Sequence, residues 1–313
     1  LLRKQNPSAQ HAWQVIIRRG EYIMPETLNL SVDDSGTETS PLLFKGEEGA
    51  MPVFYGGFFL NKFERISDSL WKTDVPQVRR YGWRFEQLYV NGSRAIRAQS
   101  PNVGFYKPVS VKETVIVNGD GRAPELAVQQ IKIPAEAANR IKNLNEEDLK
   151  DAVITFYHHW DNTKKPVQFY NAADTSIYIS GEGMKPWNPV TTASLFAIEN
   201  VSSALDAPGE WFLESSGTLY YYPKPGETIE TTTAMAPALD KFITLSGNAA
   251  TGEKIKNIRF ENISFRVAGY RMPAGGVEPA QSAAPIAAVI ELDFASRVSF
   301  VNCEISATGS SGI

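Results

Sequence analysis

Two carboxylates lie at alternate positions of a short apolar run, Val289-Ile-Glu-Leu-Asp293. Side chains two residues apart on a strand point to the same side, so Glu291 and Asp293 share one face. A pair of carboxylates about 5–5.5 Å apart, or about 6.5–9.5 Å apart, is the machinery of glycosidic-bond hydrolysis. A solvated acidic face produces the same pattern, and we favour that simpler interpretation here and for Glu304, which also points outward from its strand.

A proline–glycine turn presents a second candidate group in Leu205-Asp-Ala-Pro-Gly-Glu-Trp211. The turn places Glu210 and Trp211 at the entrance of a strand. In one interpretation Trp211 stacks on a sugar in the wall of a cleft. In the other, which we favour, Trp211 anchors a core and Asp206 caps the turn.

The long excursion from Arg266 to Ala287 is rich in Gly, Pro and Ala. Long loops inside a compact fold usually carry function. Tyr270, Arg271 and Gln281 in this excursion are therefore candidates for substrate contact.

The segment His158-His159-Trp160-Asp161 suggests a metal site or a catalytic triad. Adjacent residues on a strand point to opposite faces, so the two histidines cannot both bind one ion simply. We expect a structural role at a strand end, and no metal and no cofactor. The single cysteine, Cys303, excludes an internal disulfide.

The elements that position these groups are predicted by a repeat with an offset of 40 residues. Ile258, Phe260, Asn262 and Phe265 align with Val298, Phe300, Asn302 and Ile305. The apolar residues alternate as in short strands, and the asparagines suit bends because Asn tolerates the left-handed conformation. Short strands that recur with bends are typical of a parallel β-solenoid.

The pattern of predicted strands changes between the two ends of the chain. Strands lengthen from about residue 58, and Val90-Asn-Gly-Ser93 predicts a hairpin. Residues 134–150 contain the only convincing helical pattern. We therefore predict an all-β protein: first right-handed parallel β-helix coils in 1–57, an inserted, mostly antiparallel β-sandwich-like domain in 58–238, and the resumed β-helix in 239–313.

Composition narrows the function classes. The chain has 313 residues, a net charge of −4, 42% hydrophobic and 11% aromatic residues. These values argue against disorder, and the absence of a basic run makes nucleic acid an unexpected partner. No apolar run is long enough for a membrane span. The sequence pattern is interrupted at both ends, so we expect a fragment of a longer chain, truncated at the C-terminus. We also expect the protein to be a monomer.

Several characteristic sequence segments occur together and in a fixed order along the chain. They include Val15-Ile-Ile-Arg-Arg-Gly-Glu-Tyr22, Leu70-Trp-Lys-Thr-Asp-Val-Pro76, Gln87-Leu-Tyr-Val-Asn-Gly-Ser-Arg-Ala95 and Leu205-Asp-Ala-Pro-Gly-Glu-Trp-Phe212. Their combination resembles bacterial right-handed β-helix glycoside hydrolases with an inserted β-sandwich, families 120 and 141. The resemblance implies a substrate cleft on the parallel-strand face, partly walled by the sandwich, and catalytic carboxylates on coils beyond Ile313. It also implies a secreted, periplasmic or cell-surface bacterial protein.

We therefore expect a glycoside hydrolase-type protein that acts on a polysaccharide or its side chains by two-carboxylate acid/base hydrolysis. Two alternatives stay open. A polysaccharide lyase on the same solenoid would use a Lys or Arg base and leave an unsaturated product. A non-catalytic glycan-binding solenoid would bind an oligosaccharide or polysaccharide without turnover.

Overall fold

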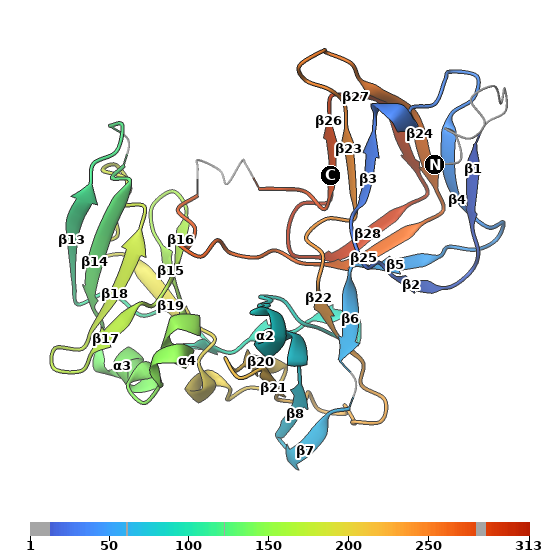
Figure 1. The fold of residues 1–313 in the computed structure, drawn as a ribbon. Helices are drawn as coiled ribbons and strands as arrows, with labels where there is room; N and C mark the ends of the chain where they lie inside the picture. The colour runs from blue at the N-terminus through green and yellow to red at the C-terminus, as the bar shows by residue number, and fades with distance from the viewer. Residues whose placement is uncertain (1–12, 61, 122, 280–285) are drawn as a thin grey trace.

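The computed structural model describes residues 13–60, 62–121, 123–279 and 286–313. It is an all-β fold made mostly of strands, with a few short helices (Figure 1). Among the described residues, no helix is both long and apolar enough to cross a membrane.

Strands from both ends of the chain assemble into parallel sheets, which lie together at the upper right of Figure 1. The first parallel sheet contains β1 (Gln14–Ile17), β4 (Leu42–Gly46), β24 (Ile255–Glu261) and β27 (Ala295–Val301). The second contains β2 (Glu21–Ile23), β5 (Val53–Tyr55), β25 (Ser264–Ala268) and β28 (Glu304–Thr308). The third contains β3 (Leu28–Ser31), β23 (Ile243–Ser246) and β26 (Ile290–Asp293).

The predicted offset of 40 residues is the register of two strand pairs, β24 with β27 and β25 with β28. Phe260 is the partner of Phe300, and their rings stack with centroids 5.0 Å apart and an interplanar angle of 7°. The predicted asparagine bends are also confirmed, because Asn262 has a φ of 54° and Asn302 a φ of 50°. Asn302 Nδ2 donates to Asn262 Oδ1 at 2.8 Å. Each bend therefore stacks on the previous one.

Burial in this region is less uniform than the sequence pattern predicts. Ile258, Phe260 and Ile263 are at most 1% exposed, whereas their partners Val298, Phe300 and Cys303 are only half-buried. The apolar run Val15–Ile17 lies in β1 and is largely exposed, because β1 pairs on one side only, with β4. An edge strand has fewer neighbours to cover its side chains.

The remaining sheets are antiparallel apart from the β11–β20 pair. One contains β6 (Gly57–Leu60), β9 (Tyr89–Val90), β10 (Ser93–Arg94) and β22 (Ala234–Pro237). The next contains β7 (Glu64–Ser67), β8 (Leu70–Asp74), β11 (Ile96–Arg97), β20 (Glu210–Leu213) and β21 (Thr218–Tyr221). The predicted Asn91-Gly92 hairpin joins β9 to β10, with φ values of 50° and 75°.

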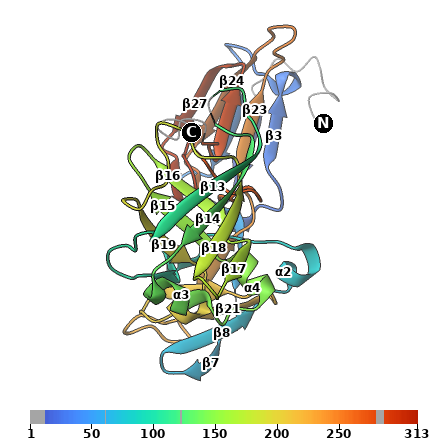
Figure 2. The same cartoon turned by 90° about the vertical axis from the view of Figure 1, so that its left-hand side faces the viewer.

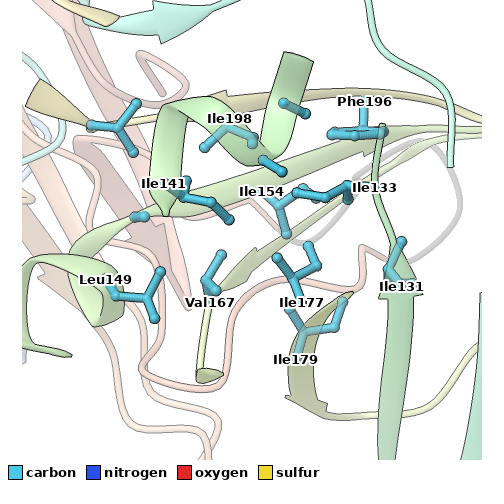
Figure 3. Close-up of a cluster of buried hydrophobic side chains, with 14 of the residues drawn as sticks. Ile131, Ile133, Ile141, Leu149, Ile154, Val167, Ile177, Ile179, Phe196 and Ile198 are labelled. Atoms are coloured by element: carbon cyan, nitrogen blue, oxygen red, sulfur yellow. The ribbon is translucent and has the colours of Figure 1, made fainter. Parts of the chain in front are cut away.

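Two further sheets face each other at the left of Figure 1, and Figure 2 shows the second of them from the front. The first contains β12 (Gln99–Ser100), β15 (Val153–Tyr157), β16 (Asn162–Pro166) and β19 (Leu195–Glu199). The second contains β13 (Ser110–Val117), β14 (Leu126–Lys132), β17 (Phe169–Asn171) and β18 (Ser176–Gly181). Their inner faces supply Ile154, Phe196, Ile131 and Ile177 to one buried cluster (Figure 3).

Short helices and 3-10 turns connect the strands. They are α2 (Pro76–Tyr81), α3 (Ala135–Ile141) and α4 (Glu146–Asp151), with 3-10 turns η1 (Val32–Asp34) and η2 (Ser202–Ala204). The predicted helical segment 134–150 is confirmed as α3 and α4. The sequence prediction missed α2, although it has Pro76 at its first position and Gly82 in the left-handed conformation at its end.

Two connections join the antiparallel region to the parallel sheets. At the neck, β6 pairs with β22, and Gly57 lies opposite Pro237. The second connection is a strap, residues 269–279, which follows β25. Val277 in the strap forms an antiparallel bridge with Lys164 of β16, with N···O distances of 2.7 and 2.9 Å.

Candidate functional site

A cleft of about 760 Å³ opens between the second parallel sheet and the sheet of β6, β9, β10 and β22. Its lining includes rings and charged groups: Tyr55, Phe59, Tyr89, Arg94, Arg266 and Glu304.

Strand register brings the polar groups of the cleft together. Tyr55 of β5 lies opposite Arg266 of β25, and Ser264 of β25 lies opposite Glu304 of β28. Arg266 Nη2 donates to Glu304 Oε2 at 2.7 Å, and Ser264 Oγ donates to the same oxygen at 3.2 Å. Ser306 Oγ donates to Glu304 Oε1 at 2.8 Å. Both carboxylate oxygens therefore have partners on the sheet itself.

These contacts fix the charge of Glu304. Hydrogen bonds from Arg266 and Ser306 hold the pKa of Glu304 below its ordinary value, so the carboxylate is ionised at neutral pH. On the neighbouring strands, Tyr55 Oη donates to Glu21 Oε1 at 3.3 Å. Burial and the charge of Glu21 raise the pKa of Tyr55, so its phenol stays neutral and remains a donor.

The opposite wall of the cleft is aromatic. Tyr89, Met235 and Val267 form a small buried cluster with Tyr55 against it. The ring of Phe59 meets Tyr55 edge-on, with centroids 5.7 Å apart. The Tyr89 hydroxyl is buried and has no hydrogen-bond partner among the described residues. An unused hydroxyl is costly at such a site unless something else bonds to it.

Together these groups suit recognition of a polyhydroxylated molecule more than proton donation. A guanidinium, a carboxylate and two phenols offer donors and acceptors beside aromatic rings. An ionised Glu304 cannot act as a general acid. Of the lining residues that the structure describes, it is the sole carboxylate.

Glu210 and Trp211 lie outside this cleft. Trp211 is fully buried in the core around β8, β20 and β21 and stacks on Phe85 with centroids 5.3 Å apart. Glu210 is 2% exposed, and its Oε2 accepts from the backbone N–H groups of Asp206 and Ala207 at 2.9 and 2.8 Å. The core-anchoring interpretation of Trp211 therefore describes this structure, and the turn is capped by Glu210.

The candidates in the excursion are partly engaged in structural contacts. The Gln87 side chain bonds to both the N–H and the C=O of Tyr270, at 2.8 and 3.0 Å. Arg271 pairs with Asp240 at 2.5 Å and lines a separate hollow of about 400 Å³ with Trp83. Gln281 lies outside the described residues.

Glu291 and Asp293 share a face of β26, as predicted, but not the cleft. Glu291 pairs with Lys241 at 2.6 Å. Asp293 is exposed and borders a shallow hollow at the edge of β26 and β27. Leu292, between them, is 39% exposed, and β26 is an edge strand.

The histidine segment belongs to a buried polar cluster. His158, Asp161 and Glu278 offer ligand atoms within 4.8 Å of one another, the one such group among the residues that the structure describes. Lys185 Nζ already lies 2.9 Å from Asp161 Oδ2 and 3.5 Å from Glu278 Oε1. His159 points elsewhere, with its ring against Trp160.

Sequence analysis did not assign Arg266, Tyr55, Tyr89 or Glu304 to a site. A usable signal existed for two of them. The 40-residue offset pairs Ser264 with Glu304, and alternation places Arg266 on the same face. Tyr89 comes from a sheet without that repeat, so no pattern linked it to the others.

Comparison with known proteins adds three findings. The family model described as the GH141 insertion domain matches residues 68–224, half of the chain. A solved structure titled "Glycoside hydrolase" superposes with a TM-score of 0.77 at 22% identity, over 98% of this chain. A second, titled "The complex structure of XylC with xylose", has a TM-score of 0.39 at 12% identity over 96% of this chain and 36% of that one, too low to support an argument.

The chain spans 57% of the length of the first solved structure. No curated protein matches the sequence. The similarity to the first structure establishes the fold alone, and the family match establishes a glycoside hydrolase-like protein.

Proposed function

Because the chain belongs to the GH141 insertion domain family through residues 68–224, we propose that it is the carbohydrate-binding part of a glycoside hydrolase that acts on a polysaccharide or its side chains. The cleft between the second parallel sheet and the sheet of β6, β9, β10 and β22 is the observation that carries the proposal. It combines aromatic rings with a charged, hydrogen-bonded row of side chains, the mixture that sugar hydroxyls and ring faces require.

The proposed architecture is a right-handed parallel β-helix in residues 1–57 and 239–313, interrupted by a β-sandwich-like insert in 58–238. Its support is that strands from both ends of the chain join the same three parallel sheets, with an offset of 40 residues between β24 and β27 and between β25 and β28. The matched range 68–224 falls inside the proposed insert.

The proposed chemistry is hydrolysis by two carboxylates, with the general acid and its partner outside residues 1–313, as the family resemblance implies. Glu304 contributes a fixed negative charge. A charge of this sign beside a sugar ring stabilises the positive charge that develops when a glycosidic bond breaks. Arg266 holds that carboxylate in place and offers remaining N–H donors to sugar hydroxyls.

The proposed partner is an oligosaccharide or polysaccharide, bound by a monomeric protein at the bacterial surface, in the periplasm or outside the cell. The non-catalytic alternative is favoured by one observation: Glu304, the sole carboxylate among the described lining residues, is ionised and paired with Arg266. Residues 1–313 are thus expected to bind sugar without turning it over.

Calorimetric titration with neutral and acidic plant cell-wall oligosaccharides tests the cleft. Arg266→Met removes the guanidinium and is expected to weaken binding about tenfold, the value of one hydrogen bond to a charged group. Arg259→Met is the matched control, because Arg259 pairs with Glu261 on β24, in a different sheet. Equal affinities for both variants and the unaltered chain would refute the cleft as the sugar site.

Turnover is measured on the same samples with aryl glycosides and cell-wall polysaccharides. Release of the aryl group by residues 1–313 would show that the acid lies within this chain. An unsaturated, ultraviolet-absorbing product would favour the lyase instead.

A further inference from the structure

Two exposed tryptophans lie in two neighbouring four-residue loops. In the β15–β16 hairpin, His158 N donates to Asp161 O at 3.2 Å, which places Trp160 third in a four-residue turn. In the loop after β18, Asn188 N donates to Lys185 O at 2.9 Å, which places Trp187 third in a second turn. Trp160 is 67% exposed and Trp187 is 57% exposed.

The corner residues of the two turns bond to each other. His158 Nδ1 donates to Asn188 O at 2.8 Å, and Asn188 Nδ2 donates to Asp161 Oδ1 at 2.8 Å. Trp160 N donates to Asn188 Oδ1 at 3.3 Å. Asn188 is 3% exposed, so these bonds are shielded from water. The backbones that carry the two tryptophans are therefore held side by side.

A buried charge group fixes the turns to the strap. Lys185 Nζ lies 2.9 Å from Asp161 Oδ2 and also bonds to Pro279 O. Thr163 Oγ1 donates to Glu278 Oε2 at 2.6 Å. Burial alone would lower the pKa of Lys185, but the hydrogen bond that Lys185 donates to Asp161 and the charge of Glu278 together raise that pKa, which keeps the ammonium charged.

The backbones of the two turns are held by these bonds, whereas the two indole rings that they carry are exposed to solvent. Trp71 and Trp211, by comparison, fill the core. Large apolar rings that are exposed to water on a fixed backbone mark an interaction surface. The loss of backbone conformational entropy has already occurred on folding, so less is lost when a ligand binds. The charged side chains of the turns, Asp161 and Lys185, pair with each other at their base and are only 10% and 13% exposed. The surface therefore presents ring faces rather than a net charge.

We propose that Trp160 and Trp187 form an indole platform that binds a neutral polysaccharide chain by stacking on successive sugar rings, at a place distinct from the cleft. The sugar class rests on the proposed function; the platform itself rests on the turn geometry. A neutral chain is preferred over an anionic one because no unpaired cation of the two turns lies at the base of the platform. A protein partner or a second copy of the chain are the competing occupants.

Affinity gel electrophoresis of the full 313-residue chain tests this platform, with arabinoxylan and xyloglucan as neutral polymers and homogalacturonan as an anionic polymer. We expect the neutral polymers to retard the unaltered chain. The double variant Trp160→Ala/Trp187→Ala is expected to weaken that binding at least about tenfold, since two stacking contacts are lost. Phe169→Ala is the matched control, because Phe169 is a 56% exposed aromatic residue on a different sheet.

Fluorescence supplies a readout that a purely structural role would not move. Binding of a neutral polymer should shift the tryptophan emission of the unaltered chain to shorter wavelength, and the shift should vanish in the double variant while its circular dichroism is unchanged. Single variants should fall between the two, which separates stacking from a folding defect.

Three results would overturn the platform: unchanged retardation of the double variant, retardation by homogalacturonan alone, or dimerisation of the unaltered chain that the double variant abolishes. Failure of the cleft is distinguishable, because Arg266→Met tests short oligosaccharides and leaves Trp160 and Trp187 intact. Loss of one kind of binding without the other identifies which proposal fails.

Discussion

The parallel-stranded region and the inserted region bring polar side chains together in opposite ways. In the parallel sheets, Ser264, Arg266 and Glu304 meet because stacked strands repeat with a fixed offset. In the insert, Thr163 bonds to Glu278, which lies 115 positions away in the strap. The first arrangement follows from a repeat, whereas the second depends on one particular crossing of the chain.

The exposed fraction of these polar side chains also differs between the two regions. The side chains of Arg266 and Glu304 are 39% and 40% exposed, whereas those of Asp161, Lys185 and Glu278 are 10%, 13% and 4% exposed. Exposed ion pairs contribute little to stability but stay available to a ligand. Buried ones are closed to ligands, and breaking them is costly. The cleft is thus built for contact and the charge group beneath the platform for rigidity.

The largest effect is expected from the core of the parallel region. Phe260 is 1% exposed and stacks between Phe44 and Phe300, each 5.0 Å away. Phe260→Ala should lower the free energy of unfolding by about 3–5 kcal/mol. Phe300→Ala should cost clearly less because Phe300 is half-buried. Denaturant unfolding followed by circular dichroism measures both, and equal losses would contradict the burial difference.

The buried charge group should give the next effect. Lys185→Met leaves Asp161 and Glu278 without their cation and should cost about 3 kcal/mol. Lys72→Met is the control, since Lys72 pairs with Glu64 at the surface and should cost less than about 1 kcal/mol. Chemical unfolding compares the two, and similar losses would show that the group under the platform adds no rigidity.

A smaller effect is expected at the stacked bends. Asn262 has a φ of 54°, a conformation that costs a residue with a Cβ about 1–2 kcal/mol unless its side chain compensates. Asn262→Ala should therefore destabilise by about 1 kcal/mol, while Asn262→Gly should be nearly neutral. Thermal unfolding of the two variants separates backbone strain from the lost bond to Asn302. A larger loss for glycine than for alanine would contradict this assignment.

The smallest effect concerns pH. The pKa of Glu304 is lowered in the folded protein by Arg266, so its stabilising contribution is present above the unfolded glutamate pKa of about 4.3 and is lost as pH falls through the lower folded value. Glu304→Gln should therefore reduce stability slightly at neutral pH, and this loss should disappear once the pH falls below the lowered folded pKa of Glu304. Unfolding midpoints measured across this range check the difference, which should disappear in acid.

The sequence predicted those parts of the fold that repeat or carry strong local signals. Sequence analysis found the offset between Phe260 and Phe300 and the bends at Asn262 and Asn302. It could do so because apolar alternation and bend residues are visible within a short stretch of sequence. The left-handed conformation of Val267 within β25, with a φ of 65°, could not be found in this way, because a β-branched residue is rare in that conformation.

The candidate site was less predictable for a physical reason. Its walls come from two sheets, and only the wall on the repeat has a register that the sequence encodes. Trp211 and Trp160 illustrate the limit on aromatic residues: both lie next to turns, yet one is buried and the other exposed. Composition cannot separate them, since exposure is decided by which sheets pack over each turn.

The neck and the strap together have a mechanical consequence. The neck alone, where Gly57 lies opposite Pro237, would act as a hinge and allow torsion. The bridge between Val277 and Lys164 adds a third crossing of the chain away from that axis, which restrains rotation. The cleft and the platform would then lie at a fixed distance from each other. A polymer long enough to reach both would gain avidity that a short oligosaccharide cannot.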